Sequence, residues 1–196
     1  MPGSFRENPF IEKKLRFDFG TSPGATRYEQ WPSHIGKWQN DGRTAVDFIY
    51  HDEASQKLFF TEIKDYTTIT KTGRAGQGTY SEELAQMVAR KATDSIAGFG
   101  LASESEDEDE RSFHNSFKDY SFRVVFHWEF KRSVKQPYRR LQMMQMKGKL
   151  RELLHGGLHA CRRGKYRGLP IGILDCPQNW QNCAMKNKIW QIAPGG

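Results

Sequence analysis

Two apolar runs, each interrupted by an acid, constrain this chain more than any other feature of its sequence. The runs span residues 45–50 and 58–65, and a polar segment separates them. Runs of this length and composition, joined by a short polar segment, predict a β-hairpin. Asp47 and Glu62 stand where such strands normally carry apolar or neutral side chains. Acids in these positions need a partner, which points to a chemical role for the hairpin.

The expected register groups these acids. If the strands pair antiparallel about the middle of the polar segment, Asp47 lies opposite Glu62. Side chains alternate along a strand, so Lys64 shares a face with Glu62. Opposed carboxylates repel unless a cation lies between them, and oxygen ligands favour Mg²⁺ or Mn²⁺ over zinc. The hairpin therefore predicts a Mg²⁺ or Mn²⁺ site in which Lys64 orients an attacking water or offsets charge on a phosphate.

A hairpin without any site is the plain alternative, with one polar face in solvent. Apolar residues such as Ile49 and Phe60 interleave with the charges, which argues against a fully solvated face. Short acid-x-Lys patterns also arise by chance. The pattern alone leaves both interpretations open.

Length and composition predict a single domain over residues 1–196. The N-terminus lacks the apolar core of a signal peptide, and no apolar run approaches the length of a membrane span. Three cysteines fit reduced thiols better than a disulfide framework. We therefore expect a cytoplasmic protein with no membrane partner.

Charge is segregated along the chain. The formal net charge is +7, and residues 131–196 hold 14 Lys and Arg but only two acids. Six acids fall between Glu104 and Glu110. A basic region of this kind predicts a polyanionic partner, for which nucleic acid is the first choice, although ordinary solubility charge is the alternative.

The remaining pattern predicts helices flanking a sheet. A helix begins after the N-cap Ser81 and ends near Gly98 and Gly100, and a second helix spans residues 137–155. The β-branched and aromatic stretch 120–130 predicts a central strand. The sequence further predicts short strands at 15–19, 26–31, 169–174 and 188–192, a loop at 32–43, and an acidic loop or disordered insert at about 101–118.

Several basic residues are candidates for binding a nucleic-acid backbone. Arg74 lies in a Gly-rich basic segment, residues 71–78, which reads as a loop beside the site. Lys91 falls near the inner face of the first helix, where a lysine at the helix edge is the alternative to a site residue. The candidates are Arg74, Lys91, Arg139, Arg140, Arg162 and Arg163.

A structural zinc site is a separate alternative in the C-terminal third. His155, His159 and Cys161 are close in sequence, and Cys176 and Cys183 follow. His-x3-His is an acceptable spacing on a helix, but two glycines between the histidines are expected to break it, and no Cys-x2-Cys pair is present.

The order of these elements resembles the core of the PD-(D/E)xK, or restriction-endonuclease-like, superfamily. The resemblance covers about residues 25–130 and is carried by Asp47, by the stretch Glu62-Ile63-Lys64-Asp65-Tyr66, and by a following helix rich in Ala, Lys and Asp. The chain is similar in particular to small uncharacterised bacterial proteins of that fold. The resemblance implies that Asp47 and Glu62 bind metal and that Lys64 is catalytic.

Members of the superfamily often add an upstream acid, for which Glu29 is the best-placed candidate and Glu12 and Asp41 are weaker ones. That acid usually comes from a helix preceding the hairpin, whereas residues 30–43 do not predict a good helix.

These observations predict an α/β fold with a mixed central sheet of about five or more strands flanked by helices. The expected function is metal-dependent hydrolysis of nucleic acid, with DNA preferred over RNA, in bacterial defence or DNA processing. Residues 131–196 are expected to form a basic extension of the core. The resemblance further implies a homodimer or a larger complex. The alternative is a non-catalytic nucleic-acid-binding or assembly subunit, and a nuclease that is active only in a complex is a further possibility.

Overall fold

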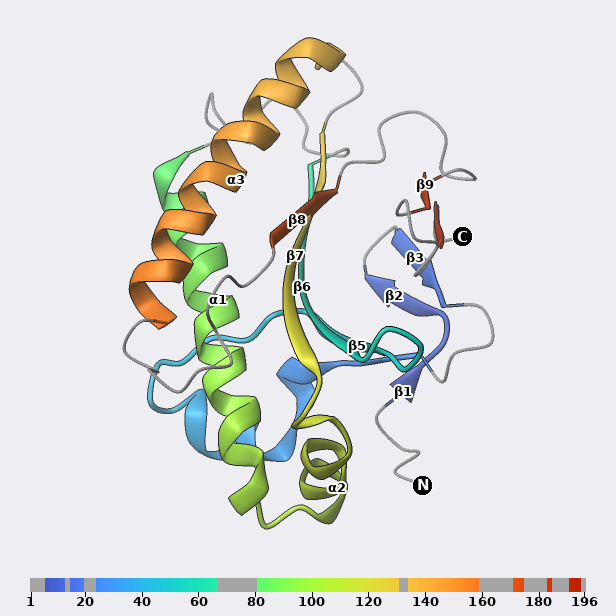
Figure 1. The fold of residues 1–196 in the computed structure, drawn as a ribbon, viewed down its shortest axis with the longest axis vertical. Helices are drawn as coiled ribbons and strands as arrows, with labels where there is room; N and C mark the ends of the chain where they lie inside the picture. The colour runs from blue at the N-terminus through green and yellow to red at the C-terminus, as the bar shows by residue number, and fades with distance from the viewer. Residues whose placement is uncertain are drawn as a thin grey trace.

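A six-stranded mixed sheet forms the centre of the molecule (Figure 1). The computed structural model describes residues 6–12, 15–19, 24–66, 81–130, 134–158, 171–174, 183–184 and 191–194. In spatial order the strands are β1 (Arg6–Glu7), β4 (Ala25–Thr26), β5 (Phe48–Asp52), β6 (Lys57–Asp65), β7 (Ser121–Glu129) and β8 (Ile171–Leu174). β1, β4, β5 and β6 pair antiparallel, whereas β6, β7 and β8 pair parallel. The expectation of a mixed α/β sheet is confirmed.

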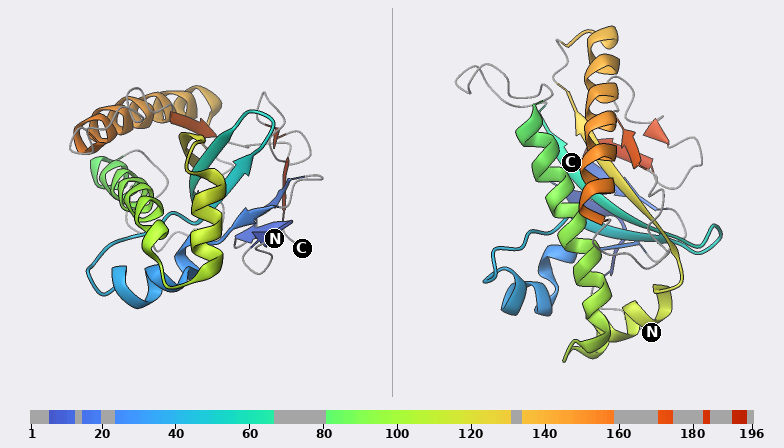
Figure 2. Two further views of the ribbon diagram at one scale, coloured as in Figure 1. Left: turned by 60° about the horizontal axis from the view of Figure 1, so that its bottom comes forward. Right: turned by 60° about the vertical axis from the view of Figure 1, so that its left-hand side comes forward.

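Two layers cover the central sheet. Helices α1 (Glu82–Leu101) and α3 (Gln136–Leu158) lie together on one face (Figures 1 and 2). A second, antiparallel sheet lies on the other face, in the order β2 (Phe10–Glu12), β3 (Leu15–Asp18), β10 (Gln191–Pro194) and β9 (Cys183–Ala184). Each layer encloses its own apolar cluster. Phe60 and Phe126 pack on the helix side, and Phe17 and Val125 pack between the sheets.

The β5–β6 hairpin has the register that the sequence predicted. Phe48 pairs with Thr61 and Asp52 with Lys57. Asp47 immediately precedes β5, so one further step in this register sets it opposite Glu62. Because side chains alternate, Glu62 and Phe60 share the helix face of β6, while Ile63 points towards the second sheet.

Helix α1 begins as its sequence predicts. The Ser81 hydroxyl accepts a hydrogen bond from the backbone N–H of Leu84 at 3.1 Å, and Glu82 and Glu83 occupy the first turn. The face carrying Val88, Ala92 and Ile96 is buried against the sheet. The helix continues to Leu101, through both glycines expected to end it.

The prediction of an acidic loop over residues 101–118 is wrong. This stretch contains a 3₁₀ turn, η3 (Ala102–Glu104), and helix α2 (Glu108–Phe117). Three of the six acids, Glu108, Asp109 and Glu110, lie in the first turn of α2, where they favour the helix because its N-terminal end carries partial positive charge. Phe113 and Phe117, four residues apart, then bury one face of α2 in the core.

Two further expectations differ from the structure. Residues 32–43 are not a loop throughout, because a π-helix, η2 (His34–Trp38), follows the 3₁₀ turn η1 (Tyr28–Gln30). The paired glycines expected to break the second helix lie inside α3, which ends at Leu158. Among the described residues, no helix combines the length and the apolar character that a membrane span requires.

Candidate active site

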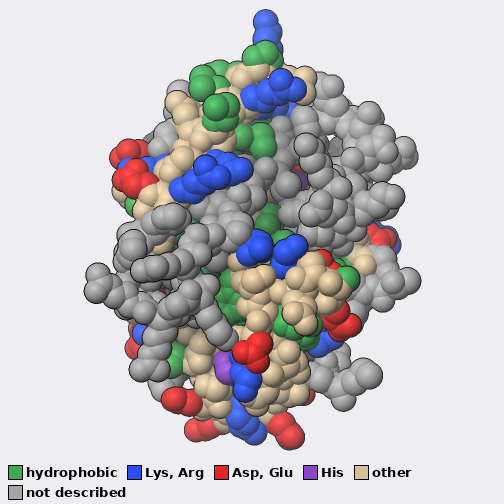
Figure 3. Space-filling model, in the orientation of Figure 1, with side chains coloured by type: hydrophobic (Ala, Val, Ile, Leu, Met, Phe, Trp, Pro, Cys, Tyr) green, Lys and Arg blue, Asp and Glu red, His purple; other side chains and the backbone are tan. Residues whose placement is uncertain are grey.

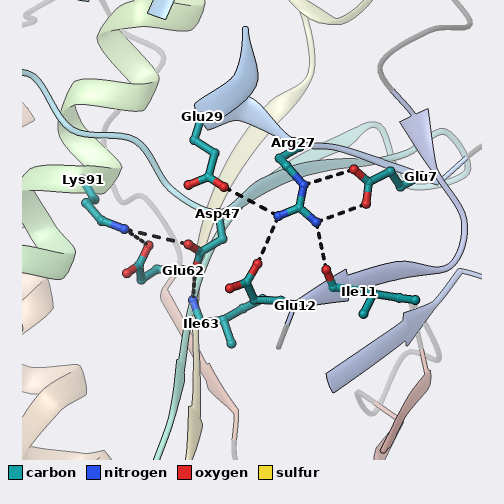
Figure 4. A network of polar contacts seen from close by, with 9 residues as sticks. All are labelled: Glu7, Ile11, Glu12, Arg27, Glu29, Asp47, Glu62, Ile63 and Lys91. Carbon is teal, nitrogen blue, oxygen red and sulfur yellow. Dashed lines mark hydrogen bonds and ion pairs between the residues drawn. The ribbon is translucent and has the colours of Figure 1, made fainter. Parts of the chain in front are cut away.

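Glu62 is the centre of the site and is contacted by two lysines. Its side chain is 1% exposed. The Lys64 Nζ lies 2.6 Å from Glu62 Oε1, and the Lys91 Nζ lies 2.9 Å from Glu62 Oε2. Lys64 comes from the same strand, β6. Lys91 comes from α1 (Figure 4). A fully buried carboxylate is costly unless it is paired, and here cations from two elements provide that pairing.

Asp47 lies beside this pair. Its Oδ2 accepts a hydrogen bond from the backbone N–H of Ile63 at 2.5 Å, and its Oδ1 lies 3.8 Å from the Lys91 Nζ. Burial, together with the neighbouring charge of Glu62, raises the pKa of Asp47 from 3.8 to about 7. The structure therefore brings Asp47, Glu62 and Lys64 together as the sequence predicted.

The electrostatics of Lys64 are dominated by its neighbours. Burial of its ammonium group lowers the pKa, but Glu62, Asp47 and Glu12 outweigh burial and raise it above the ordinary lysine value. Lys64 therefore carries a proton at neutral pH. In this state it is a positive charge beside the carboxylates and cannot act as a base.

Helix α1 also fixes the backbone that leads into Asp47. The Asp94 carboxylate accepts hydrogen bonds from the Thr44 backbone N–H at 2.9 Å and from the Thr44 hydroxyl at 3.0 Å. The Ser95 hydroxyl accepts one from the backbone N–H of Val46 at 2.9 Å, in a fully buried contact. Since Lys91 lies one turn earlier on α1, the same helix positions both Asp47 and the lysine that faces it.

Arg27 anchors the acids at the edge of the site. Its guanidinium contacts Glu7 through Nε at 3.1 Å, Glu12 through Nη1 at 3.0 Å and Glu29 through Nη1 at 3.6 Å (Figure 4). It also stacks over the Phe10 ring, 4.2 Å from the ring centroid. Burial opposes the charge of Arg27, but Glu7 and Glu12 raise its pKa above the ordinary arginine value. Arg27 is thus a permanent cation that ties β1, β2 and η1 together at the edge of the site.

Glu29 and the other upstream acids do not join the central pair directly. Glu29 lies in η1, ahead of the hairpin, with its side chain 45% exposed and its ion pair made to Arg27. Glu12 likewise pairs with Arg27. Asp41 is exposed in the turn after η2.

The residues present fit an oxygen-ligated divalent cation. Asp47 and Glu62 supply two adjacent carboxylates, and the Lys64 Nζ lies 2.6 Å from the buried Glu62 Oε1. Mg²⁺ is commonly held by one or two carboxylates together with waters and substrate phosphates. Within the described residues no group of three or more His, Cys, Asp or Glu side chains could hold a metal. The fit is therefore to a cation that takes its remaining ligands from water and substrate.

The basic candidates fall into different environments. Lys91 is a half-buried site residue that pairs with Glu62. Arg139 is only 2% exposed, with Nε bonded to the Val134 carbonyl oxygen at 2.6 Å, so it does not lie on the surface, whereas Arg140 is exposed. The remaining candidates, Arg74, Arg162 and Arg163, lie outside the described residues. The same holds for His159, Cys161 and Cys176 and for the side chains of His155 and Cys183, the residues of the zinc alternative.

Sequence reasoning did not identify Arg27 or Ser95. Arg27 had a weak signal, a lone arginine directly before the aromatic residue Tyr28 and two residues from Glu29. Helical periodicity places Ser95 only on the buried face of α1. Its role as a hydrogen-bond acceptor depends on the path of residues 44–46, which helical periodicity does not contain.

Comparisons with known proteins identify no relative. No family model matches this chain, and no curated protein or solved structure is significantly similar to it.

Proposed function

We propose that this protein is a metal-dependent phosphodiesterase that hydrolyses nucleic acid. The observation that carries the proposal is the grouping of Asp47, Glu62 and Lys64 on one face of a hairpin, with Lys91 opposite them. The resemblance of these residues and their order to PD-(D/E)xK nucleases supports the same assignment. DNA is the preferred substrate, and the fold would be a restriction-endonuclease-like core.

Each residue has a chemical task in this proposal. Asp47 and Glu62 bind the cation, and a bound Mg²⁺ or Mn²⁺ would polarise a phosphoryl oxygen and acidify a water. Lys64, which is protonated, orients the nucleophilic water by hydrogen bonding and offsets negative charge on the reacting phosphate. Lys91 offsets the charge of Glu62 when the cation is absent. Asp94 and Ser95 hold the backbone before Asp47 so that its carboxylate keeps its place.

The pairing of Glu62 with two lysines also favours a second candidate. Lys64 and Lys91 together neutralise the charges of Asp47 and Glu62 without any metal ion. A non-catalytic nucleic-acid-binding or assembly subunit could retain the hairpin in this form. Such a protein would bind nucleic acid in a salt-dependent way and would not require a metal.

Cleavage assays on labelled single- and double-stranded DNA and RNA, with Mg²⁺, Mn²⁺ or EDTA, test the proposal. Lys64→Met is compared with Lys57→Met, a matched control because both lysines lie on β6 and only Lys64 contacts Glu62. We expect metal-dependent cleavage that falls by about a hundredfold or more in Lys64→Met and persists in Lys57→Met. Salt-dependent binding without cleavage under all of these conditions would favour the binding subunit.

A further inference from the structure

Helix α3 exposes a face that its own packing does not need. Its buried side is already complete, because Met146, Leu150 and Leu154 are each 0% exposed. On the opposite side, Tyr138 is 46% exposed and Leu141 is 50% exposed. Met144 is also exposed, at 72%. These are three of the six large hydrophobic side chains exposed among the described residues, and the fold gives no reason for their exposure.

A line of basic side chains meets this apolar stripe at its Met144 end. The residues of α3 include five Lys and Arg but one acid, Glu152, which pairs with Lys149 at 3.0 Å. At about 100° per residue, Arg140, Lys147 and Arg151 lie within about 20° of one line along the helix. The apolar stripe runs obliquely towards that line: Tyr138 lies about 160° from it, Leu141 about 100° and Met144 about 40°, so the two meet near Lys147. Figure 3 shows hydrophobic and basic side chains next to each other over α3.

The combination of the two stripes selects among polyanions. A nucleic-acid duplex presents phosphates outside and keeps its base faces stacked inside, so exposed aromatic and aliphatic side chains gain little from it. A single strand presents phosphates and unstacked base faces together, and base faces stack on aromatic side chains. The basic line extends about 16 Å at a rise of about 1.5 Å per residue, enough for a short segment of single strand.

From this we infer that the exposed face of α3 binds single-stranded nucleic acid, with Arg140, Lys147 and Arg151 on the phosphates and Tyr138, Leu141 and Met144 against the bases. The inference rests on the proposed function for its choice of nucleic acid as the polyanion. It deepens that function by assigning the single strand as the form that the protein holds.

Binding measured in EDTA tests this face separately from catalysis. The probe is a fluorescent 20-nucleotide oligothymidylate, titrated by anisotropy beside a 20-base-pair duplex. We expect Tyr138→Ala and the double variant Leu141→Ser/Met144→Ser each to weaken binding of the oligothymidylate by about tenfold or more. Leu101→Ser, which changes an exposed leucine at the end of α1, is the matched control and should bind as the wild type does.

The basic line has its own readout. The slope of log K against log salt concentration is negative, and Arg140→Gln/Arg151→Gln should reduce its magnitude by about 1.4. Each phosphate contact to a single strand contributes about 0.7 to that magnitude. Arg16→Gln, which changes an exposed arginine on β3, should leave the slope unchanged. Thermal unfolding of every variant verifies that the fold is intact.

The outcomes separate this inference from the proposed function. Equal or tighter binding of the duplex, or full binding by the apolar variants, would overturn the inference even if the protein cleaves DNA. Conversely, loss of single-strand binding in these variants would support it even if no cleavage is found, because no binding measurement here requires an active site.

Discussion

Asp47 is the residue whose ionisation the fold alters most clearly in a direction that can be measured. Burial and the charge of Glu62 raise its pKa from 3.8 to about 7. Between these two values the unfolded chain has lost its proton while the folded protein retains it. Stability therefore falls as pH rises from about 4 to about 7, and the lost part stays lost above pH 7.

Asp47→Asn should remove this penalty. Three pKa units correspond to about 4 kcal/mol, so we expect the variant to exceed the wild type in free energy of unfolding by up to about 4 kcal/mol at pH 8. The amide oxygen can still accept the Ile63 N–H, and the two proteins should be equally stable near pH 4. Urea denaturation in EDTA at both pH values measures this. A variant less stable than the wild type at pH 8 would contradict a raised pKa for the Asp47 carboxyl group.

Ser95 offers a second prediction, based on position. Ser95→Ala removes the acceptor of the buried Val46 N–H, which should cost about 1–3 kcal/mol and weaken Mn²⁺ binding by displacing Asp47. Thr93→Ala is the matched control, because the Thr93 hydroxyl bonds only to the Ala89 carbonyl oxygen of the same helix. We expect it to change the free energy of unfolding by less than about 0.5 kcal/mol. Equal effects in urea denaturation would remove Ser95 from the positioning role.

Helix α2 illustrates how one element recruits a distant one. The Asp107 carboxylate caps the helix by accepting the Glu110 N–H at 3.0 Å. Glu110, which is 1% exposed, in turn accepts hydrogen bonds from the Ser33 backbone N–H at 3.0 Å and the Ser105 hydroxyl at 2.6 Å. The acidic segment therefore stabilises both its own helix and the start of the η2 region.

Asp107→Ala should destabilise the protein by about 1 kcal/mol through loss of the cap. Glu108→Ala removes the same charge from the same turn but no capping bond, so it should cost only a few tenths of a kcal/mol. Thermal unfolding of the two variants at equal ionic strength makes the comparison. If their melting temperatures are equal, charge rather than capping governs the start of α2.

At the scale of the whole molecule, the sequence predicted the local elements better than their long-range pairing. Strand periodicity predicted the hairpin register, and the N-cap predicted the start of α1. Strands were also expected near β3 and β10, but the expectation of one sheet missed that these two form part of a second one. β3 pairs with β10, Leu15 opposite Pro194, across almost the entire chain. Propensity indicates that a segment is extended, but it contains no information about which distant segment completes its hydrogen bonds.

The site was predictable to the same extent. Asp47, Glu62 and Lys64 lie on one hairpin, so strand alternation sufficed to group them. Helical periodicity places Lys91 near the edge of the inner face of α1 and does not decide whether it belongs to the site. Only the packing of α1 on β6 brings its ammonium group to Glu62. The three carboxylate partners of Arg27 come from β1 in the central sheet, from β2 in the second sheet and from η1, so no local pattern in the sequence could indicate them.

The central claim is that Glu62 belongs to a metal-dependent catalytic site, and the comparison of Glu62→Gln with Glu129→Gln tests it most directly. Both glutamates are 1% exposed on neighbouring strands, but Glu129 pairs with His127 at 2.6 Å, whereas Glu62 pairs with Lys64 and Lys91. The measurement is the Mg²⁺-dependent rate of DNA cleavage per folded molecule. We predict a loss of at least about a hundredfold in Glu62→Gln and near wild-type rates in Glu129→Gln. Equal rates in the two variants, or no cleavage by the wild type, would contradict the account.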